Sequence, residues 1–488
     1  MNSKIEQSAA AIATRYKMTT DMPAGVLTPD RVETRLGTLS FFDGFPDDAT
    51  VAKVFDNLDF QRAVQAYLQG LPAVQLLATR TGLLQWGPVN RTAVVLEDLL
   101  DSRTLFQGGN ANTVYWWMWL DTHGGPVVLE LPPQVYGTLT DTWSRWVVDL
   151  GIVGPDQGQG GKYLLLPPGY TGEIPDGYFV VRPLTFNTIV LFRTFLVNGD
   201  PKPGVERGKA HLRIYPLAHA ANPPQTICVN ISGKAFSLIG PSDSTAFEYI
   251  NQAIQEEPVE ASDPNTLGQF ASIGIKKGQP FAPDERMQHI LAEAARVGDA
   301  TARALNFRYR DRSGYYSTNA WRVIYHGGYL FEQDGVRLWD AYFAFFYRTW
   351  GVSPAVAEKM VGMGSQATDA YVDAHGEPFD GSKTYRLHLP GPIPAKEFWS
   401  VILYDIQTGS MLQTDQRLPM VSSQTPGLGV NPDTSVDVYF GPEPPAGHEA
   451  NWVQTVPGKS WYTTLRLYKP LEPWFDGTWR PGEFERLD

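Results

Sequence analysis

The sequence predicts a mainly β protein with helical insertions, in which two antiparallel, jelly-roll-like β-sandwiches are joined by a helical segment. Three observations lead to this fold class. From residue 384 onward, β-branched and aromatic residues alternate at period two between Gly/Pro breaks, which is typical of antiparallel strands. The 46 Gly and 38 Pro are spread along the chain as turn punctuation. Helical periodicity is concentrated in two stretches, before residue 90 and between residues 240 and 375.

These changes of pattern divide the chain into four parts. We expect a helical N-terminal segment over residues 1–90, a first β-sandwich domain over 91–235, a helical linking region over 236–375 and a second β-sandwich domain over 376–488. A chain of 488 residues is long enough for roughly two to four domains of ~100–200 residues each.

The N-terminal segment carries two helical signals. Val51, Val54, Phe55 and Leu58 recur at helical spacing and share one face. Pro72 then predicts the start of a second apolar helix, because proline is favoured in a first helical turn. We expect this helix pair to pack on a sheet or on a second subunit.

The strands of the first sandwich are predicted where apolar and β-branched residues run together. The candidate ranges are 113–120, 126–131, 163–166, 178–182 and 188–197. Residues 151–162 contain five Gly and one Pro, which indicates a loop.

The linking region and the second sandwich follow. Pro283 and Asp284 open a predicted helix, Ser353-Pro354 opens another, and the aromatic run 339–350 is expected to be buried. Strands of the second sandwich are predicted over 384–389, 398–405, 436–440 and 462–468.

Composition narrows the class of protein. Charged residues make up 19%, below the ~25% of an average globular protein, while aromatic residues reach 12% with 14 Trp. This favours large aromatic cores, an aromatic-lined cavity or a substantial subunit interface, and we expect a homo-oligomer. The net charge of −12 argues against a nucleic-acid partner.

The location of the protein is predicted from what the sequence lacks. Residues 1–7 show neither a basic n-region nor an apolar h-region, so we expect no signal peptide. No run of ~18 apolar residues occurs, so we expect no contact with a membrane and a cytoplasmic location. The lone Cys228 excludes an intrachain disulfide and is expected to be a small buried apolar residue.

Familiar catalytic and cofactor signatures are missing from the sequence. It contains no Gly-x-Ser-x-Gly elbow, no phosphate loop and no dinucleotide fingerprint. None of the eight histidines pairs at the spacing of a metal-binding helix. We therefore predict no metal ligand, leave the cofactor unknown, and keep open a site assembled from distant strands.

One group of polar and aromatic residues surrounds the tryptophan-rich strand. Tyr115, Trp117 and Asp121 lie on or beside it, and Asp141 and Trp143 follow. A carboxylic acid held near an apolar wall has a raised pKa and can exchange protons near neutral pH. The alternative is that both carboxylates end strands and accept backbone hydrogen bonds in turns.

Arg193 is a lone cation in an apolar strand, so it must be paired or extend to solvent. It forms a structural ion pair or, alternatively, anchors an anionic ligand. The predicted catalytic residues are Asp141, Arg193, Tyr115 and Asp121, and the last of these can meet Tyr115 only if the strand between them bends.

A second group lies in the C-terminal sandwich, where Trp399, Tyr404 and Asp405 are followed by Asn451-Trp452. Aromatic rings and a few polar groups on strands are typical of a ligand-binding surface. The predicted ligand-binding residues are Trp117, Trp143, Trp399, Tyr404, Asp405, Asn451 and Trp452.

Long runs of this sequence resemble a bacterial family with two tandem domains of unknown function, numbered 1254 and 1214. The C-terminal resemblance rests on residues 380–387, 394–400, 404–408, 411–415, 451–452 and 466–468, and the N-terminal one on 112–115, 161–164, 167–170 and Arg193. The resemblance implies two jelly-roll-like sandwiches with helices between them. It implies no settled reaction, because fold alone does not determine function.

These features predict an enzyme that acts on a small organic molecule in an aromatic-lined cavity by acid-base or hydrolytic chemistry. Two alternatives stay open: a non-catalytic binding protein for a carbohydrate or a hydrophobic ligand, and a structural or assembly protein. A paired acid and base in one cleft would favour the enzyme, a flat aromatic platform the binding protein, and a large apolar interface the assembly protein.

Overall fold

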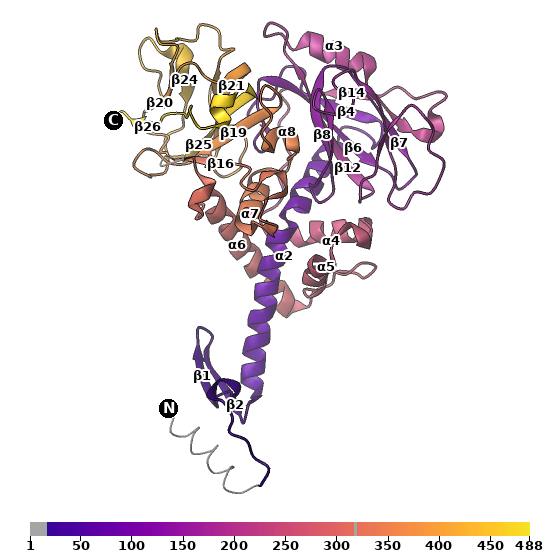
Figure 1. Cartoon of the computed structure of the whole chain (residues 1–488), viewed down its shortest axis with the longest axis vertical. Coiled ribbons are helices and arrows are strands. Elements are labelled where there is room, and N and C mark those ends of the chain that lie inside the picture. Colours follow the sequence, from indigo (N-terminus) through magenta and orange to yellow (C-terminus); the bar gives the residue numbers. More distant parts are fainter. Residues whose placement is uncertain (1–16, 317–319) are drawn as a thin grey trace.

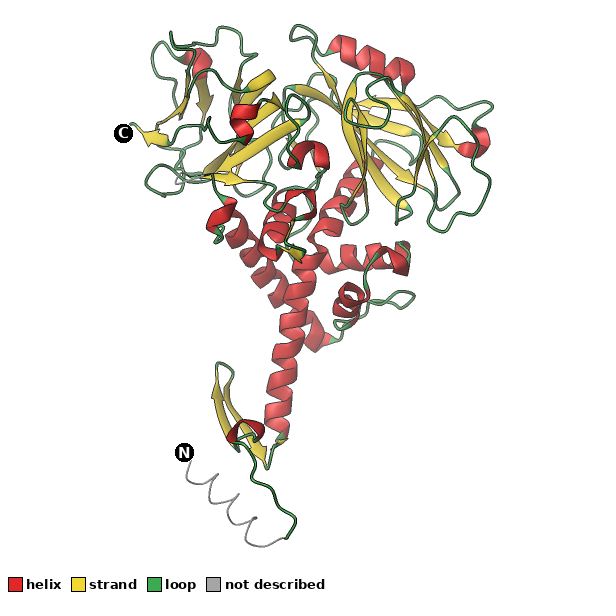
Figure 2. Ribbon diagram, viewed as in Figure 1, coloured by secondary structure: helices red, strands yellow, loops and turns green. Residues whose placement is uncertain are grey.

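The computed structural model describes residues 17–316 and 320–488. Two β-rich regions lie side by side above a group of helices, and one long helix projects from that group (Figure 1). The fold is mainly β with several helices, as Figure 2 shows, and none of the described sheets closes into a barrel. The predicted jelly-roll connection of the strands stays a prediction.

The first β region contains two sheets around one core. The larger sheet has the order β14 (Ile227–Asn230), β4 (Thr92–Val95), β6 (Thr113–Asp121), β12 (Asn187–Phe195), β8 (Val135–Asp141) and β9 (Trp146–Gly151). The smaller has the order β11 (Phe179–Val181), β10 (Gly161–Leu165), β7 (Val127–Leu131) and β13 (Arg213–Pro216). Most neighbouring strands are antiparallel; β14–β4 and β10–β11 are parallel.

Strand β6 is apolar on both faces because both faces are buried. Trp116 and Met118 point into the core shared by the two sheets, and Trp116 stacks on Phe192 of β12. Tyr115 and Trp117, on the other face, belong to the large core formed with the helices. A strand covered on both sides reads as a continuous apolar run, which explains the pattern of this segment.

The second β region is also built from two sheets that share a core. The larger has the order β16 (Trp321–Val323), β19 (Ser365–Ala370), β25 (Trp461–Pro470), β21 (Ala395–Asp405) and β22 (Met420–Ser422). The smaller has the order β24 (Trp452–Gln454), β23 (Val436–Gly441), β20 (Tyr385–Leu389) and β26 (Phe484–Arg486).

Two strands of this larger sheet, β16 and β19, come from the segment expected to link the two β regions. The sequence of β19, Ser-Gln-Ala-Thr-Asp-Ala, has no large apolar residue and so carries no strand signal. Its polar side chains are nevertheless buried, because they bond to neighbouring strands: Thr368, for example, donates to the carbonyl of Arg322.

The helices fill the space beneath the sheets. They are α2 (Asp48–Leu84), α3 (Lys202–His211), α4 (Ala246–Glu256), α5 (Pro264–Ala271), α6 (Glu285–Phe307), α7 (Trp339–Arg348), α8 (Pro354–Ala357) and α9 (Glu472–Phe475). Short 3₁₀ turns are η1 (Ala24–Val26), η2 (Leu217–His219), η3 (Val259–Ala261), η4 (Arg312–Gly314), η5 (Gly328–Leu330) and η6 (Glu449–Asn451). Short strands are β1 (Arg31–Thr34), β2 (Gly37–Phe42), β3 (Phe45–Pro46), β5 (Thr104–Leu105), β15 (Phe236–Ser237), β17 (Glu332–Gln333) and β18 (Val336–Arg337). Within the described ranges, no helix has the length and apolar character needed to cross a membrane.

The prediction that Pro72 opens a second helix is wrong, because α2 is one helix of 37 residues with Pro72 inside it. A proline in a helix interior costs about 3 kcal/mol. Here the surrounding turns are buried, and Gly70 lies so close to α4 that an added Cβ would stand 2.2 Å from Cδ1 of Ile250. The burial of this part of α2 among the other helices offsets the cost of the proline.

Candidate functional site

A cavity of about 70 Å³ lies where the two β regions and the helices meet. Its walls come from three separate parts of the chain. The first β region contributes Phe106, Gln107, Gly108, Tyr115, Leu191 and Arg193; the helical part contributes Ile324, Tyr325, Arg348, Thr349, Trp350, Gly351 and Val356; the second β region contributes Ser365, Gln366, Ala367 and Arg466. We call this cavity the arginine pocket.

The strand register brings Tyr115 and Arg193 to the same end of the first sheet. Tyr115 in β6 lies directly opposite Arg193 in β12, and Tyr136 in β8 lies opposite Arg193 on the other side. The guanidinium carbon of Arg193 is 5.8 Å from the ring centre of Tyr115 and 4.5 Å from that of Tyr136. Arg193 is therefore held between two tyrosine rings, in cation–π contact with both.

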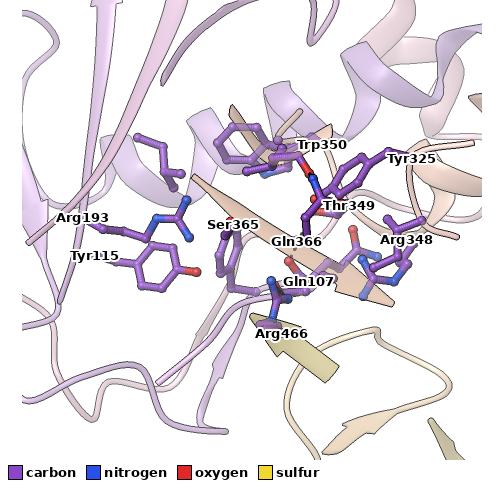
Figure 3. A pocket seen from close by; sticks show the side chains of 17 residues that line it. Gln107, Tyr115, Arg193, Tyr325, Arg348, Thr349, Trp350, Ser365, Gln366 and Arg466 are labelled. Atoms are coloured by element: carbon purple, nitrogen blue, oxygen red, sulfur yellow. Dashed lines mark hydrogen bonds between the residues drawn. The ribbon is translucent and has the colours of Figure 1, made fainter. Parts of the chain in front are cut away.

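The guanidinium groups enter the pocket from different sides, as Figure 3 shows, with Arg193 and Tyr115 on one side and Arg348 on the opposite side. Arg348 is neutralised by the fold. Its Nε is 2.5 Å from Oδ2 of the buried Asp369, and its Nη2 donates to Oδ1 of the same residue at 2.8 Å. Such a two-point pair with a carboxylate is the strongest kind of arginine contact.

Arg193 and Arg466 have no such partner. Arg193, which is 8% exposed, donates from Nη1 to the hydroxyl of Tyr468 at 3.2 Å. Arg466 donates from Nη2 to the carbonyl of Gly108 and, at 3.3 Å, to the hydroxyl of Tyr404. Among the described residues neither forms an ion pair, and the Nε atom of each is buried without a hydrogen-bond acceptor. Both groups stay charged, because arginine does not lose its proton in proteins.

The tyrosine hydroxyls in the pocket act as donors. The hydroxyl of Tyr115 accepts two hydrogen bonds from Asn110, from the backbone at 3.2 Å and from Nδ2 at 2.9 Å, so its own proton is uncommitted. Burial raises the pKa of Tyr325, although the guanidiniums of Arg466, Arg348 and Arg193 oppose the shift. Tyr325 is therefore protonated at neutral pH, and no described residue accepts a hydrogen bond from it.

An aromatic wall closes one side of the pocket. The ring of Phe106 meets those of Tyr115 and Trp117 edge-on, at centroid distances of 5.6 and 5.1 Å, and lies 6.3 Å from that of Trp350. Trp117, predicted to bind ligand, stacks behind Tyr115 and does not line the pocket.

The structure separates the four residues predicted to be catalytic into two pairs. Asp121 and Asp141 lie opposite Asn187 and Thr188 of β12, five or six residues from Arg193. At ~3.3 Å per residue this is roughly 17–20 Å along the strand. Tyr115 and Arg193 line the arginine pocket and the two carboxylates do not.

Both carboxylates are engaged where they lie. Oδ1 of Asp141 accepts from the backbone of Trp143 and of Arg145, each at 3.0 Å, and Oδ2 pairs with the Arg145 side chain. Asp121 pairs with His123, whose Nδ1 is 2.6 Å from Oδ1. This is the turn-forming role that the sequence left open as the alternative.

The other predicted ligand-binding residues lie outside the pocket. Trp143 stacks on Phe270, and Trp399 lies in the core of the second β region. Tyr404 donates to the carbonyl of Gly109 at 2.5 Å and accepts from Arg466, so it supports the pocket from behind.

The remaining three brace loops of the second β region. Asp405 accepts from the backbone of Gln407 and pairs with Lys459. Asn451 bonds to Gly429 in both directions. The indole of Trp452 donates to the carbonyl of Gly441.

Several pocket residues were not predicted from the sequence, above all Arg348, Arg466 and Tyr325. The signal used for Arg193, a single cation in an apolar run, also marks Arg466 in its strand and Arg348 in the aromatic run 339–350. Within the described ranges, no three His, Cys, Asp or Glu side chains gather in a metal-binding arrangement, and the metal-free state stays a prediction.

Comparison with known proteins agrees with the division into two β regions. The family model described as protein of unknown function (DUF1254) matches residues 89–216, and the model described as protein of unknown function (DUF1214) matches residues 364–472. A search of curated proteins finds no significant match.

Two solved structures are similar in fold. The VPA0106 protein of Vibrio parahaemolyticus is 18% identical with a TM-score of 0.56, over 88% of this chain and 100% of that one. A putative uncharacterized protein of Burkholderia cenocepacia is 12% identical with a TM-score of 0.42, over 89% of this chain and 96% of that one. The predicted resemblance is confirmed: this chain belongs to the proteins that carry the DUF1254 and DUF1214 domains in tandem.

Proposed function

We propose that this protein binds a small organic anion in the arginine pocket, through a carboxylate or phosphate group held by Arg193 and Arg466. The observation that carries the proposal is the pair of guanidiniums that face the pocket without a carboxylate partner. A buried charge without a counter-charge costs several kcal/mol, and an anionic ligand would remove that cost.

The shape and lining of the pocket favour a small ligand. A cavity of about 70 Å³ is roughly half the ~150 Å³ of an engineered apolar cavity that accepts benzene. It therefore suits a carboxylate with a short carbon chain, or the anionic end of a longer molecule. The apolar side formed by Phe106, Leu191 and Trp350 suits the carbon part of such a ligand better than a carbohydrate.

Acid-base chemistry on the bound anion is a second candidate function. It is supported by Tyr325, whose protonated hydroxyl lies within the influence of all three guanidiniums. A positioned phenol can donate a proton or stabilise a developing negative charge. If this chemistry occurs, mass spectrometry would detect a change in the incubated anion with the native chain and not with Tyr325→Phe, while binding persists in both.

Binding is tested by calorimetry and thermal unfolding with acetate, propionate and inorganic phosphate, each against chloride at equal ionic strength. We expect at least one of the three to raise the melting temperature. Arg193→Met should weaken its binding roughly 10–100-fold, because a hydrogen bond to a charged group is worth about 1.5–3 kcal/mol.

The matched control is Arg213→Met, which removes a partly buried strand arginine outside the pocket. It should leave binding unchanged. The proposal fails if none of the three anions binds and native mass spectrometry of freshly purified protein finds no bound anion. Equal losses of affinity in the two arginine variants would also contradict it.

A further inference from the structure

The N-terminal part of the described chain forms an arm that stands away from the rest of the molecule. The arm, as defined here, comprises residues 17–58: the small sheet β1–β2–β3 and the first turns of α2. In Figures 1 and 2 it lies at the far end of α2, opposite the two β regions.

The arm exposes an unusual amount of apolar surface. Phe42 and Phe45, paired across β2 and β3, are 83% and 76% exposed, and Phe55 on the next helical turns is 58% exposed. The large apolar side chains of the arm that are more than a third exposed are Met18, Met22, Val26, Phe42, Phe45, Phe55 and Leu58.

Few contacts within the chain support this arm. The backbone of Ser40 donates to Oγ1 of Thr50, and Nζ of Lys53 donates to the carbonyl of Thr38, which ties the small sheet to the helix start. Ion pairs with the body begin only where Arg286 of α6 meets Asp56 and Asp59. Small isolated sheets are marginally stable in water, and so are isolated helices shorter than ~12–15 residues.

We infer that the arm is a subunit interface, and that its partner is the arm of a second copy of this chain. Three phenylalanines with 150–250 Å² each, exposed to these fractions, present on the order of 400 Å². That is about half of the ~800 Å² that each partner buries in a stable interface, before the other apolar residues and a polar rim are added.

Charge favours another protein over a lipid surface. Residues 17–62 hold eight acidic and five basic side chains, a net charge of −3, whereas anionic membranes attract polybasic segments. Both signs are present, as in the neighbouring Arg31 and Glu33. A two-fold interface places one patch against itself, so it needs apolar residues that match each other and charges of both signs.

The test is the mass of the full chain in solution, by light scattering or sedimentation at micromolar concentration. We expect about twice the 54.2 kDa of one chain. The triple variant Phe42→Ser/Phe45→Ser/Phe55→Ser should have the mass of a single chain. A control triple, Val180→Ser/Leu184→Ser/Val430→Ser, removes apolar residues that are 43–57% exposed elsewhere and should keep the double mass.

A milder variant keeps the test decisive if the triple does not fold. Phe42→Ser changes one side chain at the tip and should weaken self-association at least tenfold without lowering the melting temperature of the body. A native chain of single mass contradicts the inference, including one that binds phosphatidylcholine vesicles instead. A double mass that persists in the folded triple variant also contradicts it.

Discussion

Arg348 and Arg193 face the same cavity from opposite sides and differ in what neutralises them. Arg348 meets the buried Asp369 with two nitrogens, so its charge is balanced within the fold. Arg193 meets tyrosine rings and one tyrosine hydroxyl, so its charge is left for a partner that the chain does not supply. Burial of a charge is common to structural and ligand-binding residues, and the missing counter-charge distinguishes the second kind.

The largest difference should appear when each arginine is replaced in the absence of ligand. Arg348→Met leaves Asp369 as an uncompensated buried charge, and we expect the free energy of unfolding to fall by about 3–5 kcal/mol. Arg193→Met leaves no charge behind, so unfolding should change by less than ~1 kcal/mol or become harder. Urea unfolding of both variants measures this. Equal losses would show that Arg193 also serves the fold.

A buried carboxylate offers the mirror image of Arg193. Burial raises the pKa of Asp149 to about 6, against opposing contacts from Ser353 and Ala355. Because the folded pKa is raised, the stabilisation from the protonated acid is complete below the unfolded value of 3.8 and is lost as the pH rises through about 6.

Each pKa unit corresponds to about 1.4 kcal/mol, so the loss from pH 4 to pH 7 is on the order of 2–3 kcal/mol. Asp149→Asn should remove this part of the pH dependence, and urea unfolding at several pH values would reveal it. An unchanged pH profile in the variant would contradict the raised pKa.

The smallest effect is expected at the other end of the first sheet. Asp141→Asn removes the charge that pairs with Arg145 but keeps an oxygen for the backbone of the turn, so we expect a loss of about 1–2 kcal/mol. Anion binding should stay within twofold of the native value, because Asp141 does not line the pocket. Loss of binding without loss of stability would return Asp141 to the list of functional residues.

The sequence predicts the two β regions well, because their strands alternate or run apolar between Gly/Pro breaks. It does not predict β19, whose buried polar residues are satisfied by partners distant in the chain. Likewise it does not predict that α2 passes through Pro72, because local propensity carries no information about the helices packed around that turn.

For the site, the sequence marks Arg193 and Tyr115, since an arginine in an apolar strand must have a reason to be there. It also marks Asp121 and Asp141, which share strands with the first pair. Only the register of β6, β8 and β12 shows that the pairs lie at opposite ends of the sheet. Arg466, some 270 residues further along the chain, reaches the same cavity only through the packing of the two β regions.

The distribution of the pocket walls has a kinetic consequence. They extend from Phe106 to Arg466, so the cavity does not exist until both β regions are folded and docked. Contacts so distant in sequence form late in folding. An anion held there would therefore leave the rate of folding almost unchanged and slow the rate of unfolding, because it stabilises the finished structure and not the transition state that precedes it.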